Sequence, residues 1–254
     1  MRPFVLLTND DGIFADGLYE LYLSIRTIAE VVIVAPDSEK SAVGHAITIS
    51  DPLRVTHFHR DGRFFGYAVN GTPADCVKLA YYAILDRKPD AVISGINLGS
   101  NTGINVIYSG TISAATEANI LGIPSFAISL ATYTDPIFKP AAKFAAKLLP
   151  VILERKLPER TFLNVNVPNV PEEEIRGVRF TRQGMAMYDD NYEVRRDPRN
   201  REYYWLTGSK VNIDHDPTID DGAIEQNYIS ITPLHYDLTN YRCLNELREW
   251  NIEF

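Results

Sequence analysis

Cysteine is scarce in this sequence, which has two, Cys76 and Cys243, among its 254 residues. The two lie far apart in the chain and match no zinc-binding or Cys-x-x-Cys redox spacing. We therefore interpret them as inert thiols, which are typical of proteins kept in a reducing compartment. This predicts a cytoplasmic protein that folds without disulfide bonds.

Long apolar runs are missing too, since none approaches the roughly 20 consecutive residues that a membrane-spanning helix needs. Met1 and Arg2 lead directly into the first apolar segment, so no signal peptide is expected. Basic residues are outnumbered, because 25 Lys and Arg stand against 33 Asp and Glu, for a net charge of −8. A broad nucleic-acid-binding surface needs a basic face. Membranes and long nucleic acids are thus excluded as expected partners, whereas a small phosphorylated ligand is not.

What the sequence does contain is an alternation of strand and helix patterns from residue 3 to about 168. Short apolar runs of the kind found in buried parallel strands occur at 4–7, 31–34, 91–93, 123–130 and 162–167. Helices are expected between them, at 17–29, 71–85, 111–121 and 139–154. This order predicts an α/β fold, a doubly wound and mostly parallel sheet with helices on both faces in a Rossmann-like three-layer arrangement.

The last third of the chain has a different character. Segments 192–196 and 201–207 flank an Asp-Pro-Arg-Asn turn sequence and predict a β-hairpin rich in charge, Tyr and Trp. Strands are also expected at 177–184 and 228–232, an acidic loop at 214–222 and a terminal helix at 241–250. We interpret residues 1–254 as a single domain with a core at about 1–175. A hairpin extension and a C-terminal helical arm make up about 176–254.

The first predicted strand ends in an acid pair, Asp10 and Asp11, followed by Gly12. Adjacent like charges at a strand end disfavour the ionised carboxylates, and a bound cation removes that penalty. Gly12 allows the backbone to turn sharply directly after the acids. Asn, Asp and Gly are also common turn residues, so this stretch alone is equally consistent with an Asp-rich turn.

Two further oxygen donors follow other predicted strands, Ser41 in the polar loop 37–44 and Asn97 after the strand at 91–93. Ligands of open α/β sheets bind beyond the carboxyl ends of the strands. Carboxylate, hydroxyl and amide oxygens suit Mg²⁺, Mn²⁺ or Ca²⁺. Together with the acid pair, these residues indicate a divalent-cation site.

A glycine-rich loop leads from Asn97 into a predicted helix that opens with Ser109, Gly110 and Thr111. Free amides and the helix dipole favour an anion at such a helix start, which predicts a phosphate cradle. The loop is not a P-loop, because the Gly-Lys-Ser/Thr ending is absent, and no G-x-G-x-x-G motif follows a strand here. An ordinary flexible loop before a helix gives the same pattern, and the nearby acid pair is what favours phosphate.

These segments together resemble the survival protein SurE family. The matching motifs are residues 8–12 (Thr-Asn-Asp-Asp-Gly), 35–37 (Ala-Pro-Asp) with Ser41, 71–76 (Gly-Thr-Pro-Ala-Asp-Cys), 94–97 (Ser-Gly-Ile-Asn) with Gly99 and Asn101, and 108–111 (Tyr-Ser-Gly-Thr). Each motif is weak alone, but five in the same order are specific. The resemblance is strong from residue 3 to about 130 and looser beyond, although 226–234 also fits. Ala42 and Val43 depart from the pattern, which affects the rim of the pocket rather than Ser41.

The resemblance implies a metal-dependent phosphatase that hydrolyses nucleoside monophosphates, a 5′-nucleotidase of the acid-phosphatase type with 3′-nucleotidase and exopolyphosphatase as additional activities. It implies one divalent ion, Mg²⁺ or Mn²⁺ with Ca²⁺ as a substitute, held by Asp10, Asp11, Ser41 and Asn97. The implied phosphate contacts are Asn101, Ser109, Gly110 and Thr111. Asp10 and Asp11 take the catalytic role. The expected substrate is a small nucleotide, and the expected assembly is a homodimer or homotetramer that exchanges its extensions.

Two other function classes share parts of this pattern. A receiver-like signalling or nucleotide-binding module without hydrolase activity also carries an acid pair after its first strand, but its phospho-accepting Asp and its Lys are missing after later strands. An aspartyl-phosphate phosphatase needs Asp-x-Asp where this chain has Asn9, Asp10 and Asp11. The acidic residues within 214–221 lack the Gly and the terminal Glu of a calcium loop, which favours a solvated linker there.

Overall fold

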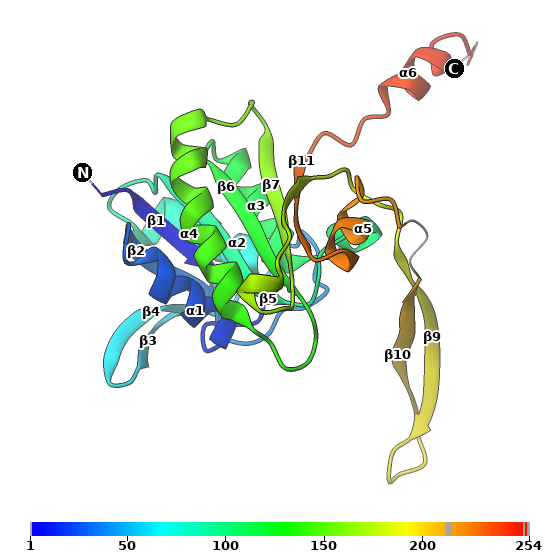
Figure 1. The fold of residues 1–254 in the computed structure, drawn as a ribbon. Coiled ribbons are helices and arrows are strands. Elements are labelled where there is room, and N and C mark those ends of the chain that lie inside the picture. Colours follow the sequence, from blue (N-terminus) through cyan, green and yellow to red (C-terminus); the bar gives the residue numbers. More distant parts are fainter. Residues whose placement is uncertain (1, 212–214, 251, 253–254) are drawn as a thin grey trace.

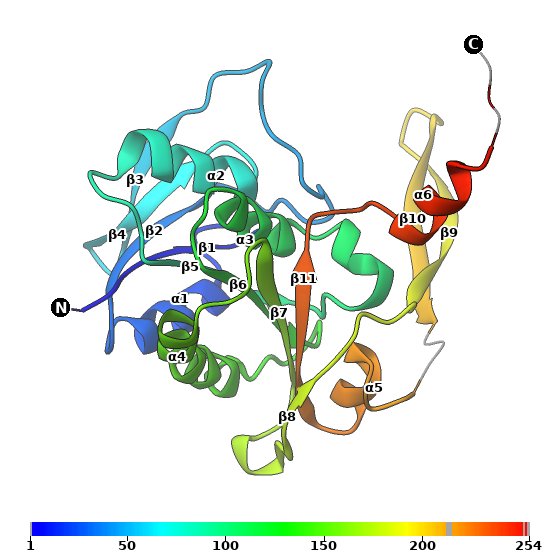
Figure 2. The same ribbon diagram turned by 90° about the horizontal axis from the view of Figure 1, so that it is seen from above.

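The computed structural model describes residues 2–211, 215–250 and 252. Its centre is a nine-stranded sheet in the order β3-β4-β2-β1-β5-β6-β7-β11-β8, and a second sheet consists of β9 and β10. Helices cover both faces of the large sheet (Figures 1 and 2). The predicted three-layer α/β architecture with an appended hairpin is therefore confirmed.

The strands alternate with helices along most of the chain. The strands are β1 (Phe4–Thr8), β2 (Glu30–Pro36), β3 (Val55–Arg60), β4 (Arg63–Val69), β5 (Ala91–Leu98), β6 (Ser125–Ala131), β7 (Thr161–Pro168), β8 (Gly177–Phe180), β9 (Met187–Arg196), β10 (Glu202–Val211) and β11 (Tyr228–His235). The α-helices are α1 (Asp16–Ile25), α2 (Pro73–Leu79), α3 (Gly110–Ile120), α4 (Phe138–Arg155), α5 (Asp220–Glu225) and α6 (Tyr241–Leu247). Short π and 3₁₀ turns are η1 (Ala80–Ile84), η2 (Gly103–Ile107) and η3 (Glu172–Glu174). Across these described segments, no helix is long and apolar enough to cross a membrane.

Strand β1 lies where the strand order of the large sheet reverses. It pairs in parallel with β2 on one side and with β5 on the other. The chain runs from β1 to β2 and β4, and then crosses back over β1 to begin β5. This reversal makes the carboxyl ends of β1 and β5 the topological switch point, where ligands of such sheets bind.

The core lies on both faces of this sheet because β1 is apolar on both sides. Val5 and Leu7 pack toward α1 and α4, whereas Leu6 packs toward α2 and α3. All five residues of β1 are buried, as expected of a central parallel strand. The helix α1 comes very close to β5, because a Cβ on Gly17 would lie 2.1 Å from the Ile96 carbonyl oxygen.

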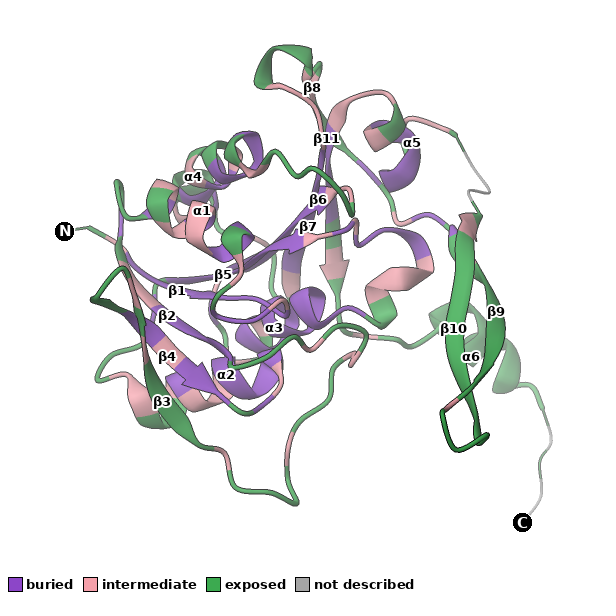
Figure 3. Cartoon of the chain, turned by 90° about the horizontal axis from the view of Figure 1, so that it is seen from below, coloured by how far each residue is buried: buried purple, intermediate pink, exposed green. Residues whose placement is uncertain are grey.

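The far edge of the large sheet is built from the last third of the chain. Strand β11 pairs antiparallel with β7, and β8 pairs in parallel with β11. The β9–β10 hairpin extends away from the body, and most of its residues are exposed (Figures 1 and 3). The arm that carries α6 also leaves the body, and its residues are exposed as well.

Several local predictions are wrong. The expected acidic loop at 214–222 contains the helix α5, whose Asp220 and Asp221 are buried rather than solvated; Asp214 lies outside the described residues. The expected glycine-rich loop contains the 3₁₀ turn η2. The strand predicted at 177–184 ends at Phe180, and the terminal helix predicted at 241–250 ends at Leu247.

Candidate active site

The predicted acid pair lies where β1 ends, beside the end of β5 and the start of α3. Asp10 is 4% exposed. Burial raises the pKa of its carboxyl above the ordinary value, although a hydrogen bond from Thr111 acts in the opposite direction. Burial and the adjacent Asp10 carboxylate together raise the pKa of Asp11 to about 7. The Asp10 carboxylate therefore disfavours the charge on Asp11, as expected for adjacent acids.

The start of α3 contacts Asp10 directly. The Thr111 hydroxyl donates a hydrogen bond of 2.6 Å to Asp10 Oδ1. A Cβ on Gly110 would lie 2.8 Å from Asp10 Cβ, so only glycine lets the helix approach this closely. Ser109 is the N-cap of α3, and its Oγ accepts the Ile112 amide at 3.1 Å. The predicted cradle and the predicted metal site thus adjoin.

The end of β5 brings the next predicted ligand to the same place. The Leu98 amide donates to Asp11 Oδ2 at 3.2 Å, which places Asn97 beside the acid pair. The Asn97 Nδ2 donates to the Gly99 carbonyl at 2.7 Å. This bond orients the side chain, and its carbonyl oxygen is the atom of Asn97 that can bind a cation.

Ser41 is less closely connected to the acid pair. Its loop reaches the site, since the Lys40 amide donates to the Asp10 carbonyl oxygen at 2.7 Å. The Ser41 side chain itself is exposed, and its hydroxyl donates to Glu39 Oε1 at 2.7 Å. The backbone of the Ser41 loop therefore lies beside the acid pair, but the Ser41 hydroxyl contacts Glu39. Its assignment as a metal ligand stays a prediction.

Asn101 lies buried in the loop that follows β5. It is hydrogen-bonded through its backbone amide, its carbonyl oxygen and its side chain. Its amide donates to Asn166 Oδ1 at 2.8 Å, and its carbonyl oxygen accepts from Asn164 Nδ2 at 2.7 Å. Its side-chain Nδ2 donates to Ser129 Oγ at 2.9 Å. These contacts fix the position of Asn101, and its side-chain oxygen remains an available acceptor. The role of Asn101 in phosphate binding stays a prediction.

The residues that hold Asn101 were missed by sequence reasoning. Asn164 and Asn166 are fully buried in β7, a strand that was expected from its apolar pattern. Two polar residues spaced by two in such a strand are themselves a signal, because a buried amide needs partners. Alternate positions of a strand point to the same face, so both asparagines face the loop that carries Asn101.

The donor set fits a hard divalent cation. Two carboxylates, the Asn97 carbonyl oxygen and a serine hydroxyl are all oxygen ligands. Asn9 Oδ1, directly before the pair, is buried without a hydrogen-bond partner. Within the described residues, no group of three or more His, Cys, Asp and Glu side chains can hold a metal. An ion here would therefore depend on amide and hydroxyl oxygens in addition to Asp10 and Asp11.

Comparison with known proteins points in one direction. The family model described as "Survival protein SurE" matches residues 5–190. A protein named 5′-nucleotidase SurE from Syntrophobacter fumaroxidans is 50% identical over 248 residues, covering 98% of this chain and 99% of its own length. A protein of the same name from Symbiobacterium thermophilum is 51% identical over 253 residues, covering 98% and 99%. The crystal structure of the SurE protein from Aquifex aeolicus is similar with a TM-score of 0.83 and 41% identity, covering 97% and 98% of the two chains.

Proposed function

This chain belongs to the survival protein SurE family, and from that premise we propose that it hydrolyses nucleoside monophosphates to nucleoside and phosphate, as a 5′-nucleotidase that uses a divalent metal ion. The observation that carries the proposal is the junction of the acid pair with the start of α3, where Thr111 donates to Asp10 at 2.6 Å. The proposed cation site and the proposed phosphate site adjoin there, which supports hydrolysis of a phosphate ester.

The proposed roles follow from the contacts of each residue. Asp10, Asp11, Asn97 and Ser41 would hold the ion, which when bound would supply positive charge for the phosphoryl oxygens and a site for the attacking water. Asp10 is kept in one orientation by the Thr111 hydroxyl. The amides at the start of α3 that have no partner within the helix would donate to a phosphate bound there and stabilise its negative charge.

The phosphate contacts are proposed at Asn101, Ser109, Gly110 and Thr111. Ser109 is 7% exposed and accepts an amide with its oxygen, so its hydroxyl proton is available to a phosphate oxygen. Thr111 donates hydrogen bonds to the Asp10 carboxylate from both its hydroxyl and its backbone amide, so its proposed part in phosphate binding is to hold that carboxylate beside the phosphate site. Gly110 contributes an amide and the space for close approach.

We also propose a cofactor, a cellular location and an assembly for this protein. Mg²⁺ or Mn²⁺ is supported by the all-oxygen donor set, and a cytoplasmic location is supported by the free thiols of Cys76 and Cys243. A homodimer or homotetramer is supported by one face of the hairpin. Cross-strand pairing places Tyr192 opposite Leu206 and Val194 opposite Tyr204, so these four apolar side chains share a face and are all exposed.

A receiver-like module has no comparable support. Its reaction needs an acid and a lysine at the ends of later strands of the sheet. Here β5 ends near Asn97, and β6 ends in Leu130 and Ala131. The geometry favours a hydrolase.

The test is phosphate release from a panel of 5′- and 3′-nucleotides and polyphosphate, with chelator and with Mg²⁺ or Mn²⁺ added. We expect release from 5′-monophosphates only with metal, and the rest of the panel decides the additional activities. Metal-independent release, or none from any nucleotide, would contradict the proposed function.

A further inference from the structure

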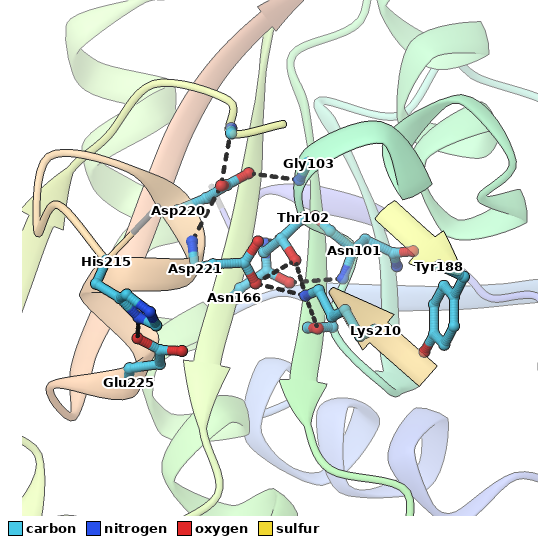
Figure 4. A network of polar contacts seen from close by, with 12 residues as sticks. Asn101, Thr102, Gly103, Asn166, Tyr188, Lys210, His215, Asp220, Asp221 and Glu225 are labelled. Carbon is cyan, nitrogen blue, oxygen red and sulfur yellow. Dashed lines mark hydrogen bonds and ion pairs between the residues drawn. The ribbon is translucent and has the colours of Figure 1, made fainter. Parts of the chain in front are cut away.

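A polar network joins the base of the β9–β10 hairpin to the loop that carries Asn101 (Figure 4). Lys210, near the end of β10, donates from Nζ to Thr102 Oγ1 at 2.6 Å and to Asp221 Oδ1. Thr102 in turn donates its hydroxyl proton to the same Asp221 oxygen at 2.8 Å. Three side chains from the loop, the hairpin and α5 therefore form a closed triangle.

Lys210 supplies the positive charge that the buried carboxylates of this network need. Asp220 and Asp221 are adjacent and buried. Asp220 is held by backbone amides, since it accepts from Gly103 and from Gly184, both at 2.9 Å. Asp221 forms an ion pair with the ammonium group of Lys210. A buried carboxylate without a cation is costly, so the position of Lys210 is strongly determined.

The network extends directly to Asn101. Thr102 is the next residue in the chain, and Asn164 and Asn166 of β7 hold the backbone of Asn101 on one side. The triangle with Lys210 holds the loop on the other side. The loop is thus held from two sides, and loosening the triangle with Lys210 would leave Asn101 held only by its contacts with β7 and Ser129.

A second contact ties the same end of the hairpin to the same loop. Tyr188 lies directly opposite Lys210 in the hairpin register, and its hydroxyl is 2.8 Å from that of Tyr133. The Tyr133 ring packs against Gly99, where a Cβ would lie 2.5 Å from a ring carbon. Lys210 therefore contacts the segment between Asn97 and Gly103 directly, and Tyr188 is connected to it through Tyr133.

We propose that Lys210 is a positioning residue for phosphate binding, which holds the Asn101 loop in place from the base of the hairpin and so couples the placement of the hairpin to the site. The inference rests on the proposed function for the role of Asn101. The apolar face formed by Tyr192, Val194, Tyr204 and Leu206 is the same face that carries Tyr188 and Lys210. A partner that covers this face would act on the loop through its base.

The experiment compares the intact chain with Lys210→Met and Lys210→Arg. The control is Lys143→Met on α4, which breaks an exposed ion pair with Glu172 of η3. Amide hydrogen exchange is followed in residues 99–104, with exchange in β5 and β6 as the internal reference. We expect at least tenfold faster exchange in 99–104 for Lys210→Met, little change for Lys143→Met, and partial rescue by Lys210→Arg.

The same variants are tested for phosphate binding with metal present. We expect the KM for a nucleoside monophosphate and the inhibition constant for inorganic phosphate to rise about tenfold in Lys210→Met, the order expected for one lost hydrogen bond to a charged group. The kcat should change less than threefold. A role in stability alone would move the unfolding midpoint without this division between KM and kcat.

Lys210→Met leaves the buried Asp221 charge without a cation, so Lys210→Met/Asp221→Leu serves as a second variant that removes both charges. It should show the same loop exchange and KM effects. Unchanged exchange in 99–104 in both variants would overturn the proposal, and so would faster exchange with unchanged phosphate affinity. If the intact chain releases no phosphate from any nucleotide, the proposed function fails, while the exchange measurement still decides whether Lys210 holds the loop.

Discussion

Thr111 donates its hydroxyl proton to Asp10 over 2.6 Å, which joins the start of α3 to the end of β1. Both residues were expected from the sequence to bind ligands, Asp10 a metal and Thr111 a phosphate. The structure shows that they also bind each other. The hydroxyl is therefore used to orient a metal ligand, and a change at Thr111 should affect metal binding first.

We expect Thr111→Val to weaken the binding of Mn²⁺ by about 10- to 100-fold, because a hydrogen bond to a charged group contributes about 1.5–3 kcal/mol. Thr111→Ser keeps the hydroxyl and should retain most of the affinity. Calorimetric titration with Mn²⁺ measures this directly. Equal metal affinity in the wild type and Thr111→Val, with loss of phosphate inhibition alone, would show that the hydroxyl serves phosphate instead.

Asp10→Asn and Asp11→Asn should each abolish metal-dependent hydrolysis while leaving the fold intact. In chelator, each variant should be as stable as the wild type or slightly more stable, because the repulsion between the two carboxylates is relieved. Phosphate release and thermal unfolding in chelator measure the two effects. Asp86→Asn, at an exposed position, is the control and should change neither. Wild-type activity in either site variant would contradict the metal mechanism.

The sequence was most informative where local pattern and physical requirement coincide. The buried strand at residues 4–8 and the acids that follow it were predictable, because a continuous apolar run is typical of a central parallel strand whose end faces the switch point. The helix start at Ser109 was predictable for the same reason, since its capping chemistry is local. Both parts of the candidate site could therefore be located from the sequence without knowledge of long-range contacts.

The sequence was misleading where a distant partner decides the structure. Asp220 and Asp221 have the composition of a solvated loop, yet they are buried, because Lys210 and the amides of Gly103 and Gly184 satisfy them. Adjacent acids give no sign of such partners. Asn164 and Asn166 were overlooked in the same way, since the loop they hold lies more than 60 residues earlier in the chain.

Glu117 should give the protein a pH-dependent contribution to stability. It is buried in α3, accepts from Lys78 Nζ at 2.9 Å and lies 2.9 Å from His45 Nε2. Burial alone would raise the pKa of Glu117, but the hydrogen bonds from His45 and Lys78 lower it below its ordinary value of 4.5. A carboxyl whose pKa is lower in the folded state stabilises the protein above its unfolded pKa, and that stabilisation is lost as pH falls further.

We therefore expect Glu117→Gln to lower the free energy of unfolding by about 1–3 kcal/mol at pH 7. The difference from the wild type should stay constant down to about pH 5 and shrink below pH 4.5. Urea unfolding at several pH values measures it. Glu172→Gln, which breaks an exposed ion pair with Lys143, is the control and should have little effect. A difference that persists unchanged at pH 3 would contradict the assigned charge.

The final prediction concerns assembly. A two-stranded ribbon is marginal alone in water, and the β9–β10 hairpin extends from the body with Tyr204 57% and Leu206 58% exposed on one apolar face. Tyr and Trp are enriched at interfaces, so we expect the intact chain to be a homodimer or homotetramer at micromolar concentration in multi-angle light scattering. Tyr204→Lys/Leu206→Lys should yield monomers, whereas Tyr82→Lys, at a 70% exposed tyrosine on η1, should not. Truncation after Leu238 removes α6, and we expect it to reduce a tetramer to a dimer. A monomeric mass for the intact chain would rule out this assembly, because the apolar face would then remain in water without a partner.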